Sequence, residues 1–260
     1  MQILTNQTGP IMGAFLGQLQ LQAMSKISNI TISNSRIASS SRAGLISAFV
    51  VTSQVSVNNV YISSSQIFSL SIVDSVLSGS IFADLNGQIN INTCIIIDIS
   101  IYSQADTWWA ISGGALGDTH TSPLIMNQII VNQSIIQAFG SQVQSVSAGG
   151  LLGYVYSASV QIYNANVNIV DISGFSNSTL VACSGLISAI SNTILSIIET
   201  KINSINILAQ GTYTQTGILL SNNGASSFTV NIVSTEGINK INLIIITNCA
   251  IVINQSQSGC

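Results

Sequence analysis

Gly150-Leu151-Leu152-Gly153 is the stretch that decides the fold, because related sequences recur along the chain at intervals of about 35 residues. Each copy begins with a glycine, and an aliphatic residue follows two positions later. The other copies begin at Gly44, Gly79, Gly114, Gly185 and Gly217, and a weaker copy is Pro10-Ile11-Met12-Gly13. The steps between the six glycines are 35, 35, 36, 35 and 32 residues. Repeats of this length are typical of stacked architectures, in which a single repeat cannot bury its apolar face alone.

Within the repeats, apolar and polar residues alternate over short runs, which indicates strands with one buried face. Such runs include Ile30-Thr31-Ile32, Val55-Ser56-Val57, Ile89-Asn90-Ile91, Val160-Gln161-Ile162 and Leu195-Ser196-Ile197. The pattern predicts an all-β chain that forms a right-handed parallel β-helix, or β-solenoid, of about seven rungs with ~35 residues per rung. We expect residues 1–260 to form one domain, either complete or part of a longer chain.

Small and polar residues mark the expected corners of each rung. Glycine at the start of a rung suits a corner that needs a positive φ or a close approach of two backbones. Asparagine-containing pairs between the strands predict the other corners, because asparagine tolerates the left-handed conformation and stacked amides can hydrogen-bond between rungs. Examples are Asn58-Asn59, Asn92-Thr93 and Asn164-Ala165-Asn166.

The composition excludes several classes of protein. Only 5% of the residues are charged, against roughly 25% in an average soluble domain, and the five basic residues are too dispersed to bind nucleic acid. The sequence contains no run of about 18 consecutive apolar residues, so it predicts no membrane-spanning helix. A surface of hydroxyls and amides is expected to be covered by glycans or by other copies of the chain. The N-terminus lacks a signal-peptide pattern, so either a leader has been removed or further sequence precedes it.

Residues 102–112 interrupt the repeat and contain both tryptophans, Trp108 and Trp109. We predict a loop that projects from the solenoid. Adjacent tryptophans on a loop could anchor a partner or stack on a sugar. In the alternative interpretation, one tryptophan covers the flank of the solenoid and the other is partly exposed.

The titratable residues are too scattered in the sequence to predict a catalytic or metal site. Asp84 and Asp118 could share a corner on adjacent rungs, since they follow their repeat glycines by five and four residues. His120, the only histidine, could join Asp118 in a metal site, but one histidine and one aspartate cannot complete it. We therefore predict no catalytic, cofactor-binding or metal-binding residue, and no enzymatic activity.

Cysteine and asparagine residues suggest two kinds of covalent modification. No Cys-x-x-Cys pair is present; Cys249 and Cys260 could form a disulfide, and free buried thiols are the alternative. Asn-x-Ser/Thr sequons could carry N-linked glycans if the chain is secreted by a eukaryote. They lie at Asn6, Asn29, Asn132, Asn177 and Asn254, and the turn-like surroundings of Asn177 make it the best candidate.

Gly150-Leu151-Leu152-Gly153 resembles the GLUG motif, Gly-Leu-hydrophobic-Gly, of repeat-containing surface and secreted proteins of bacteria and some protists. The repeat covers most of the chain, but only this copy matches fully: Ser47 and Ser188 replace the last glycine in two copies, and Ser80 and Phe82 depart in a third. The resemblance implies a β-solenoid surface protein and no catalytic residues.

Together these observations predict an extracellular or cell-surface protein that has a structural, non-catalytic role. We expect a subunit of a fibre or surface layer that polymerises head to tail, with strand residues Leu243–Ile246 pairing with the first rung of the next copy. The alternative is an adhesin or glycan-binding module that uses Trp108 and Trp109. A polysaccharide-active β-helix enzyme is the third hypothesis.

Overall fold

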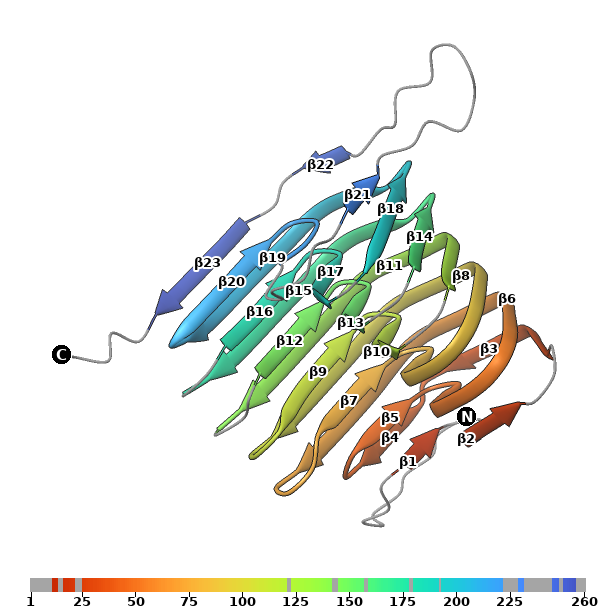
Figure 1. Ribbon diagram of the computed structural model, residues 1–260, viewed down its shortest axis with the longest axis horizontal. Coiled ribbons are helices and arrows are strands. Elements are labelled where there is room, and N and C mark those ends of the chain that lie inside the picture. Colours follow the sequence, from red (N-terminus) through yellow and green to blue (C-terminus); the bar gives the residue numbers. More distant parts are fainter. Residues whose placement is uncertain are drawn as a thin grey trace.

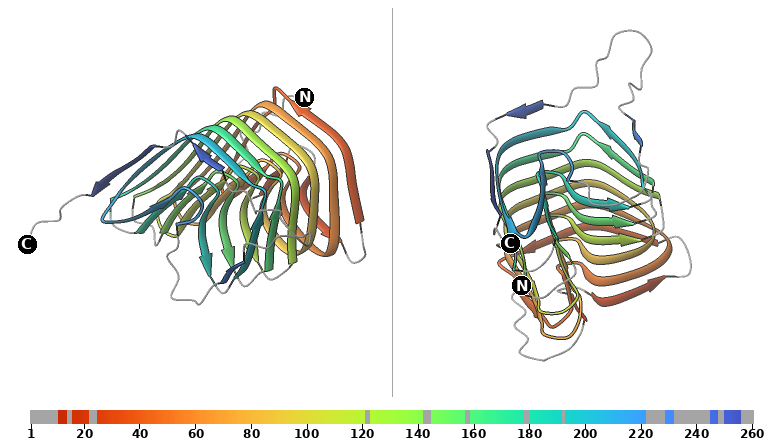
Figure 2. Two further views of the ribbon diagram at one scale, coloured as in Figure 1. Left: turned by 90° about the horizontal axis from the view of Figure 1, so that it is seen from above. Right: turned by 60° about the vertical axis from the view of Figure 1, so that its left-hand side comes forward.

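A computed structural model describes most of the chain, and every regular element in the described part is a β-strand. The described residues are 11–13, 16–21, 25–120, 123–141, 145–156, 159–177, 180–191, 193–221, 229–231, 245–247 and 250–255. The strands lie in parallel in two sheets, and successive turns of the chain stack behind one another (Figure 1 and Figure 2). The chain is therefore a parallel β-solenoid, as the repeat predicts.

One sheet contains seven short strands, one from each successive copy of the repeat. In order across the sheet they are β1 (Ile11–Gly13), β5 (Arg42–Gly44), β7 (Val76–Gly79), β9 (Trp109–Gly113), β12 (Ser145–Gly149), β16 (Leu180–Ser184) and β20 (Tyr213–Gly217).

The other sheet contains sixteen strands and forms the rest of each turn. The strands β2 (Leu16–Leu21), β10 (Leu116–His120), β13 (Leu152–Tyr156) and β17 (Ile187–Ser191) follow the corner that begins with the repeat glycine, and so do the first residues of β6 (Ser47–Ser71) and β8 (Phe82–Ala105). The long side of the turn continues along β6 and β8 and contains β3 (Ser25–Ser33), β4 (Arg36–Ser39), β11 (Pro123–Gly140), β14 (Ser159–Tyr163), β15 (Asn166–Ser176), β18 (Ile194–Ile198), β19 (Lys201–Gly211), β21 (Thr229–Asn231), β22 (Ile245–Thr247) and β23 (Ala250–Gln255).

The number of turns differs from the prediction. About seven rungs were expected, whereas the described residues form about five turns, although seven strands lie side by side in the smaller sheet. The first and last copies of the repeat are described only in part, as the short strands β1 to β4 and β20 to β23.

The register of the smaller sheet corrects the alignment of the repeat glycines. The aligned residues in this sheet are Gly13, Gly44, Gly79, Gly113, Gly149, Ser184 and Gly217. Gly114, Gly150 and Gly185, predicted as the equivalents of Gly44, therefore lie one residue further along the chain. The sequence contains the pairs Gly113-Gly114 and Gly149-Gly150, so spacing alone could not distinguish the two registers.

The corner glycines serve the close packing of backbones and do not have a positive φ, and on one turn Ser184 takes the place of the aligned glycine. A Cβ atom on Gly150 would lie 2.0 Å from the carbonyl oxygen of Gly185 on the next turn, and one on Gly149 would lie 1.8 Å from the carbonyl oxygen of Leu152. Among the described glycines, Gly87 alone has a positive φ. Of the two roles predicted for the corner glycine, the close approach is the one observed.

Left-handed residues form two ladders along the long side of the solenoid. Every non-glycine residue with positive φ in the described chain belongs to one of them, with φ between 47° and 58°. The first ladder is Asn29, Asn59, Thr93, Gln128, Asn164 and Glu199, and the second, five residues later in each turn, is Asn34, Ser64, Asp98, Gln133, Ile169 and Ser204. The corners predicted at Asn59, Thr93 and Asn164 are thus confirmed.

Amide side chains connect the turns next to these corners, as predicted. Asn92 Nδ2 donates to Asn58 Oδ1 at 3.1 Å, and Asn203 Nδ2 donates to Asn168 Oδ1 at 2.7 Å. Asn168 in turn donates to Asn132 Oδ1 at 3.0 Å, so these three asparagines form a continuous ladder. These bonds hold equivalent positions of successive turns in register.

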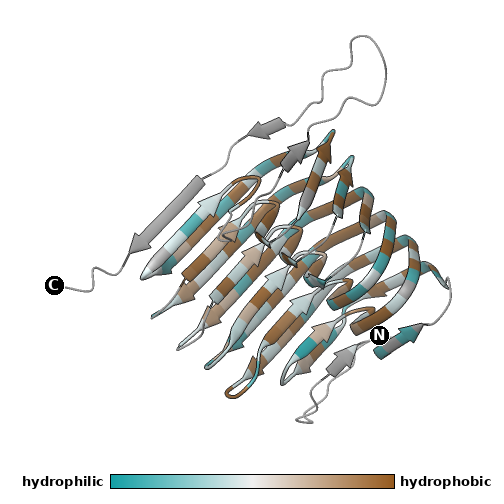
Figure 3. Cartoon of the chain, in the orientation of Figure 1, coloured by the Kyte–Doolittle hydropathy of each residue, from teal (hydrophilic) through white to brown (hydrophobic). Residues whose placement is uncertain are grey.

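Apolar ladders fill the interior of the solenoid. One ladder aligns Val57, Ile91, Met126, Ile162 and Ile197, none of which is more than 1% exposed. Bands of hydrophobic residues recur at matching places in successive turns (Figure 3). Burial of these ladders supplies the main favourable free energy of folding.

The predicted projecting loop is much shorter than expected. Residues 102–105 complete strand β8, and residues 109–112 belong to strand β9. Asp106, Thr107 and Trp108 alone lie between the two strands. The alternation of residues 102–105 continues the inward and outward pattern of β8, so this part of the segment stays in the sheet.

Replacing Ile169 with asparagine should stabilise the chain. Ile169 has φ 52° and is 50% exposed, so its β-branched side chain contributes little burial while its backbone is strained. We expect the free energy of unfolding to rise by about 0.5–1 kcal/mol in chemical denaturation. The opposite kind of change at the aligned residue of the preceding turn, Gln133→Ile, places a β-branched residue in the left-handed conformation. It should lower the free energy of unfolding by about 1 kcal/mol. Equal stabilities of all three proteins would contradict this account of the ladder.

Candidate functional site

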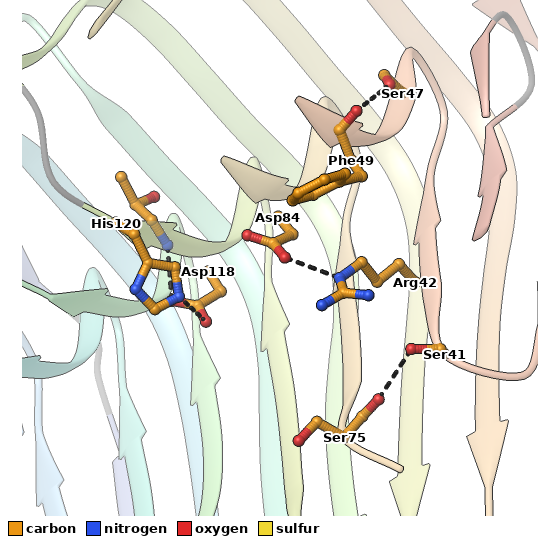
Figure 4. A network of polar contacts seen from close by, with 9 residues as sticks. Ser41, Arg42, Ser47, Phe49, Ser75, Asp84, Asp118 and His120 are labelled. Atoms are coloured by element: carbon orange, nitrogen blue, oxygen red, sulfur yellow. Dashed lines mark hydrogen bonds and ion pairs between the residues drawn. The ribbon is translucent and has the colours of Figure 1, made fainter. Parts of the chain in front are cut away.

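Four polar side chains meet where the smaller sheet lies next to the first strands of the larger sheet (Figure 4). Arg42 comes from β5, Asp84 from β8, and Asp118 and His120 from β10. We call this group the Arg–Asp–Asp–His cluster. It contains two of the eight carboxylates and the only histidine of a chain that has few charges.

The two aspartates occupy the same position on neighbouring turns. Parallel pairing aligns Asp84 with Asp118, and the same ladder continues to Phe49 on one side and Tyr154 on the other. Aligned residues of neighbouring strands are about 4.8 Å apart, so two carboxylates lie side by side. Asp84 is 5% exposed and Asp118 is 2% exposed.

Arg42 binds one oxygen of Asp84. Its Nε donates to Asp84 Oδ2 at 2.7 Å, and its guanidinium lies over the ring of Phe49, 5.2 Å from the ring centroid, which is a cation–π contact. The other oxygen, Asp84 Oδ1, is buried and has no hydrogen-bond partner among the described residues. It points away from Arg42, towards the side on which Asp118 and His120 lie (Figure 4).

Asp118 has partners for both of its oxygens. The backbone N–H of Thr119 donates to Asp118 Oδ1 at 2.7 Å, and His120 Nε2 lies 2.8 Å from Asp118 Oδ2. The side chain of His120 is 33% exposed, and its ring lies 5.9 Å from that of Tyr156. His120 and Arg42, whose side chain is 32% exposed, are therefore the parts of the cluster that solvent reaches.

Burial and the neighbouring charges shift two pKa values in this cluster. The pKa of Asp84 is raised, mainly because burial disfavours its charged form and secondly because Asp118 is close, while Arg42 opposes the shift. The pKa of His120 is raised mainly by its hydrogen bond to Asp118, against the opposing effect of burial. The cluster can thus hold protons more tightly than isolated side chains do.

The cluster also presents a set of potential metal ligands. One ligand atom each from Asp84, Asp118 and His120 lies within 4.8 Å of the other two. The sequence suggests Asp84 with Asp118, and Asp118 with His120, but it does not bring the three residues together and does not indicate Arg42. The corrected glycine register would have helped, since Asp84 and Asp118 both follow an aligned glycine, Gly79 or Gly113, by five residues.

The two tryptophans have different environments. Trp108 lies between β8 and β9 and is 50% exposed. Trp109 is half-buried on β9, packs against a small apolar cluster that includes Leu77 and Ile111, and lies 6.2 Å from the ring of Tyr154. This arrangement fits the alternative interpretation, in which one tryptophan covers the flank and the other is partly exposed.

The sequons lie in contrasting places. Asn177 is exposed at the end of β15, whereas Asn29 is exposed at a left-handed corner and accepts a bond from Asn59. Asn132 belongs to the amide ladder of β11, where Asn168 donates to it. Asn254 lies in β23, and Asn6 is outside the described residues. Asn177 remains the best candidate for glycan attachment.

The cysteines that the structure describes are buried free thiols. Burial raises the pKa of both Cys94 and Cys183 to about 12, so neither is a reactive thiolate near neutral pH. Cys249 and Cys260 lie outside the described residues, and their disulfide stays a prediction.

Raising the pH above about 6.5 should lower the free energy of unfolding through His120. Because its pKa is raised from 6.5, the folded chain binds this proton more tightly than the unfolded chain does. The stabilisation is complete below pH 6.5 and disappears as the pH rises through the pKa of the folded state. His120→Gln should remove this dependence in urea unfolding with EDTA present.

The titration of Asp84 provides an internal control for these measurements of urea unfolding against pH. Its raised pKa stabilises the folded chain below the ordinary value of 3.8, and this contribution disappears as the pH rises through the pKa of the folded state. His120→Gln leaves the Asp84 carboxyl in place, so a decline that starts near pH 4 should persist. Identical slopes above pH 6.5 in both proteins would show that His120 does not titrate as described.

Comparison with protein-family models, with curated proteins and with solved structures found no match for this chain. Among the residues that the structure describes, no helix has the length and hydropathy needed to cross a membrane. The β-solenoid fold is compatible with the repeat proteins that Gly150-Leu151-Leu152-Gly153 resembles, and this motif remains the basis of the resemblance.

Proposed function

We propose that the chain is a non-catalytic extracellular structural protein whose copies stack end to end into a fibre or surface layer. The observation that supports this proposal best is the partial exposure of the apolar interior at the first and last turns. The same interior ladders are almost completely buried in the central turns. A second copy stacked on either end would bury them in the same way.

The first described turn leaves part of its apolar interior exposed. Ile27 is only partly buried, whereas Val57, Ile91 and Met126 at the same position of later turns have no exposed surface. Strand β3, which contains Ile27, pairs with β6 on one side, and no other described strand pairs with it. Its other edge is therefore a surface on which a strand could add.

The last turn shows the same features at the opposite end. Ile218, Leu219 and Leu220 are partly buried against the core, while Leu116 and Leu152, aligned with Leu220 on earlier turns, are fully buried. Strand β20 is the last strand of the smaller sheet. Of the terminal segment Leu243–Ile246, Ile245 and Ile246 lie in β22, which pairs with β19, and the other two residues are outside the described part.

The two ends are suited to each other because every turn follows the same path. The first turn of one copy could continue the last turn of another with the same parallel pairing and the same interior ladders. Such a head-to-tail contact is heterologous, so it generates an open filament unless it closes into a ring. The low charge of the chain removes much of the electrostatic repulsion that would keep copies apart.

An extracellular location is part of this proposal. The flanks carry serine, asparagine and glutamine rather than charged residues, and Asn177 offers an exposed position for a glycan. Glycans on the flanks would keep filaments soluble without covering the ends.

A second candidate function is a cell-surface adhesin or glycan-binding module, which one exposed and several partly exposed aromatic side chains favour. Trp108 is 50% exposed. In addition, Phe68, Tyr102, Phe139 and Phe175 form a row of neighbouring rings along the solenoid, with centroids 5.1 to 6.4 Å apart. Partly exposed aromatic side chains of this kind could contact the apolar faces of sugar rings.

A polysaccharide-active enzyme is the least supported of the three hypotheses. Glycoside hydrolysis needs two carboxyl groups that face each other across the scissile bond. Asp84 and Asp118 lie side by side on neighbouring strands and are at most 5% exposed, so no sugar chain fits between them.

The stacking proposal predicts filaments with a defined axial rise. Seven strands of the smaller sheet at about 4.8 Å each correspond to about 34 Å per subunit. Electron microscopy should show this rise, and Ile27→Glu should raise the critical concentration at least tenfold, because a charge would be buried at the contact. Thr31→Glu, at an exposed position of the same strand, is the matched control. Rods of single-subunit length at every concentration would refute the proposal.

The adhesin hypothesis predicts different effects for the two tryptophans. Trp108→Ala should leave the free energy of unfolding unchanged and abolish retention on glycan-coated surfaces. Trp109→Ala should lower the free energy of unfolding by about 2 kcal/mol, because its half-buried ring packs on the apolar cluster. Glycan retention that survives Trp108→Ala would count against the role of this residue, and filament formation should be unaffected by it.

A further inference from the structure

We propose that Asp84, Asp118 and His120 bind one divalent transition-metal ion, with Zn²⁺ as the reference ion, between strands β8 and β10. The proposal is independent of the filament and the adhesin hypotheses. It rests on an unpartnered buried carboxylate oxygen, on the mutual geometry of three ligand atoms, and on the way the surrounding residues orient them.

The strongest indication is Asp84 Oδ1. Asp84 is 5% exposed, and this oxygen has no hydrogen-bond partner among the described residues. A buried polar atom without a partner destabilises the folded chain, and more so when it carries charge. Because Oδ1 is directed to the side of Asp118 and His120, a cation held there would supply the missing partner (Figure 4).

The charges of the cluster lead to the same site. Two carboxylates on neighbouring turns repel each other, and burial makes their charged forms expensive. Arg42 compensates Asp84 through its other oxygen, at 2.7 Å. A divalent ion between the two aspartates would attract both carboxylates and so offset their repulsion. A hydrogen bond from neutral His120 adds no positive charge and cannot do this.

The distances allow coordination after small movements of the side chains. Ligand atoms around a tetrahedral Zn²⁺ lie about 3.3 Å apart, since Zn–N and Zn–O bonds are about 2.0–2.2 Å. The three candidate atoms lie within 4.8 Å of one another, and His120 Nε2 and Asp118 Oδ2 are already 2.8 Å apart. Binding therefore requires these two atoms to separate by about half an ångström and Asp84 to approach.

The donor types favour a borderline transition metal over magnesium or calcium. Imidazole and carboxylate together suit Zn²⁺ and related ions, whereas Ca²⁺ prefers six to eight oxygen ligands and Mg²⁺ an octahedral set of oxygens. Three protein ligands leave one position for water. The partly exposed side of His120 gives both the ion and this water a route from solvent.

Neighbouring groups already orient two of the three ligands. Arg42 holds Asp84 Oδ2 and thereby leaves Oδ1 free, and the backbone N–H of Thr119 holds Asp118 Oδ1 and leaves Oδ2 facing His120. Hydrogen bonds from outside the ligand set commonly fix metal-binding carboxylates in this way. The alternative is a metal-free network, in which Arg42 pairs with Asp84 and His120 with Asp118.

Metal titration of the full chain distinguishes these alternatives. After removal of metal with EDTA and dialysis, Zn²⁺ should bind with one equivalent per chain in equilibrium dialysis and raise the midpoint of thermal unfolding. Bound Co²⁺ should give visible absorption bands that disappear when Zn²⁺ displaces the Co²⁺. A large excess of Mg²⁺ or Ca²⁺ should leave these bands unchanged. His120→Gln and Asp84→Asn should each weaken Zn²⁺ binding at least tenfold.

Asp171→Asn is the matched control, because Asp171 is exposed on the flank, away from the cluster. It should bind Zn²⁺ like the unmodified chain. His120→Gln keeps both aspartates and alters a partly exposed side chain, so it tests the proposal even if Asp84→Asn fails to fold. Less than one equivalent of Zn²⁺ at millimolar concentration, or equal binding by His120→Gln and the unmodified chain, would overturn the proposal in favour of the metal-free network.

Discussion

Parallel pairing between turns is the constraint on which the rest of this structure depends. Each turn satisfies its backbone hydrogen bonds with the turns before and after it, so every turn must follow nearly the same path. The two left-handed ladders show this requirement in its plainest form. The conformation recurs in every central turn, even where the residue is Ile169, whose β-branched side chain disfavours it. The stack therefore imposes backbone geometry on residues that would not adopt it alone.

Close packing at the glycine corner is the second consequence of stacking. The backbones of Gly150 and Gly185 approach so closely that no Cβ atom fits between them. Elsewhere each turn can vary, because side chains on the flanks point to solvent and the ladders inside need only be apolar. This explains how the repeat can be recognised from a few glycines and alternating residues although the copies share little other identity.

The sequence therefore predicts the fold better than it predicts the cluster. Alternation and a constant repeat length specify a parallel solenoid, and the corners at Asn59 and Asn164 follow from the conformational preference of asparagine. The exact register does not follow, because Gly113-Gly114 offers two equivalent alignments. When the glycines are aligned one residue out of register, Asp84 and Asp118 no longer follow their glycines by the same number of residues. Nothing local in the sequence indicates that Arg42 lies beside the two aspartates.

The Arg–Asp–Asp–His cluster is unlike the rest of the ladder in which it lies. The same position holds Phe49 on the turn before the two aspartates, and Tyr154 and then Ala189 on the turns after them. Apolar residues would fill it at lower cost, because two adjacent buried carboxylates gain stability only from good partners. Arg42 and His120 supply such partners for three of the four carboxylate oxygens, together with the backbone of Thr119. The fourth oxygen, Asp84 Oδ1, has no partner that offsets the free-energy cost of its burial. A bound cation would supply this partner.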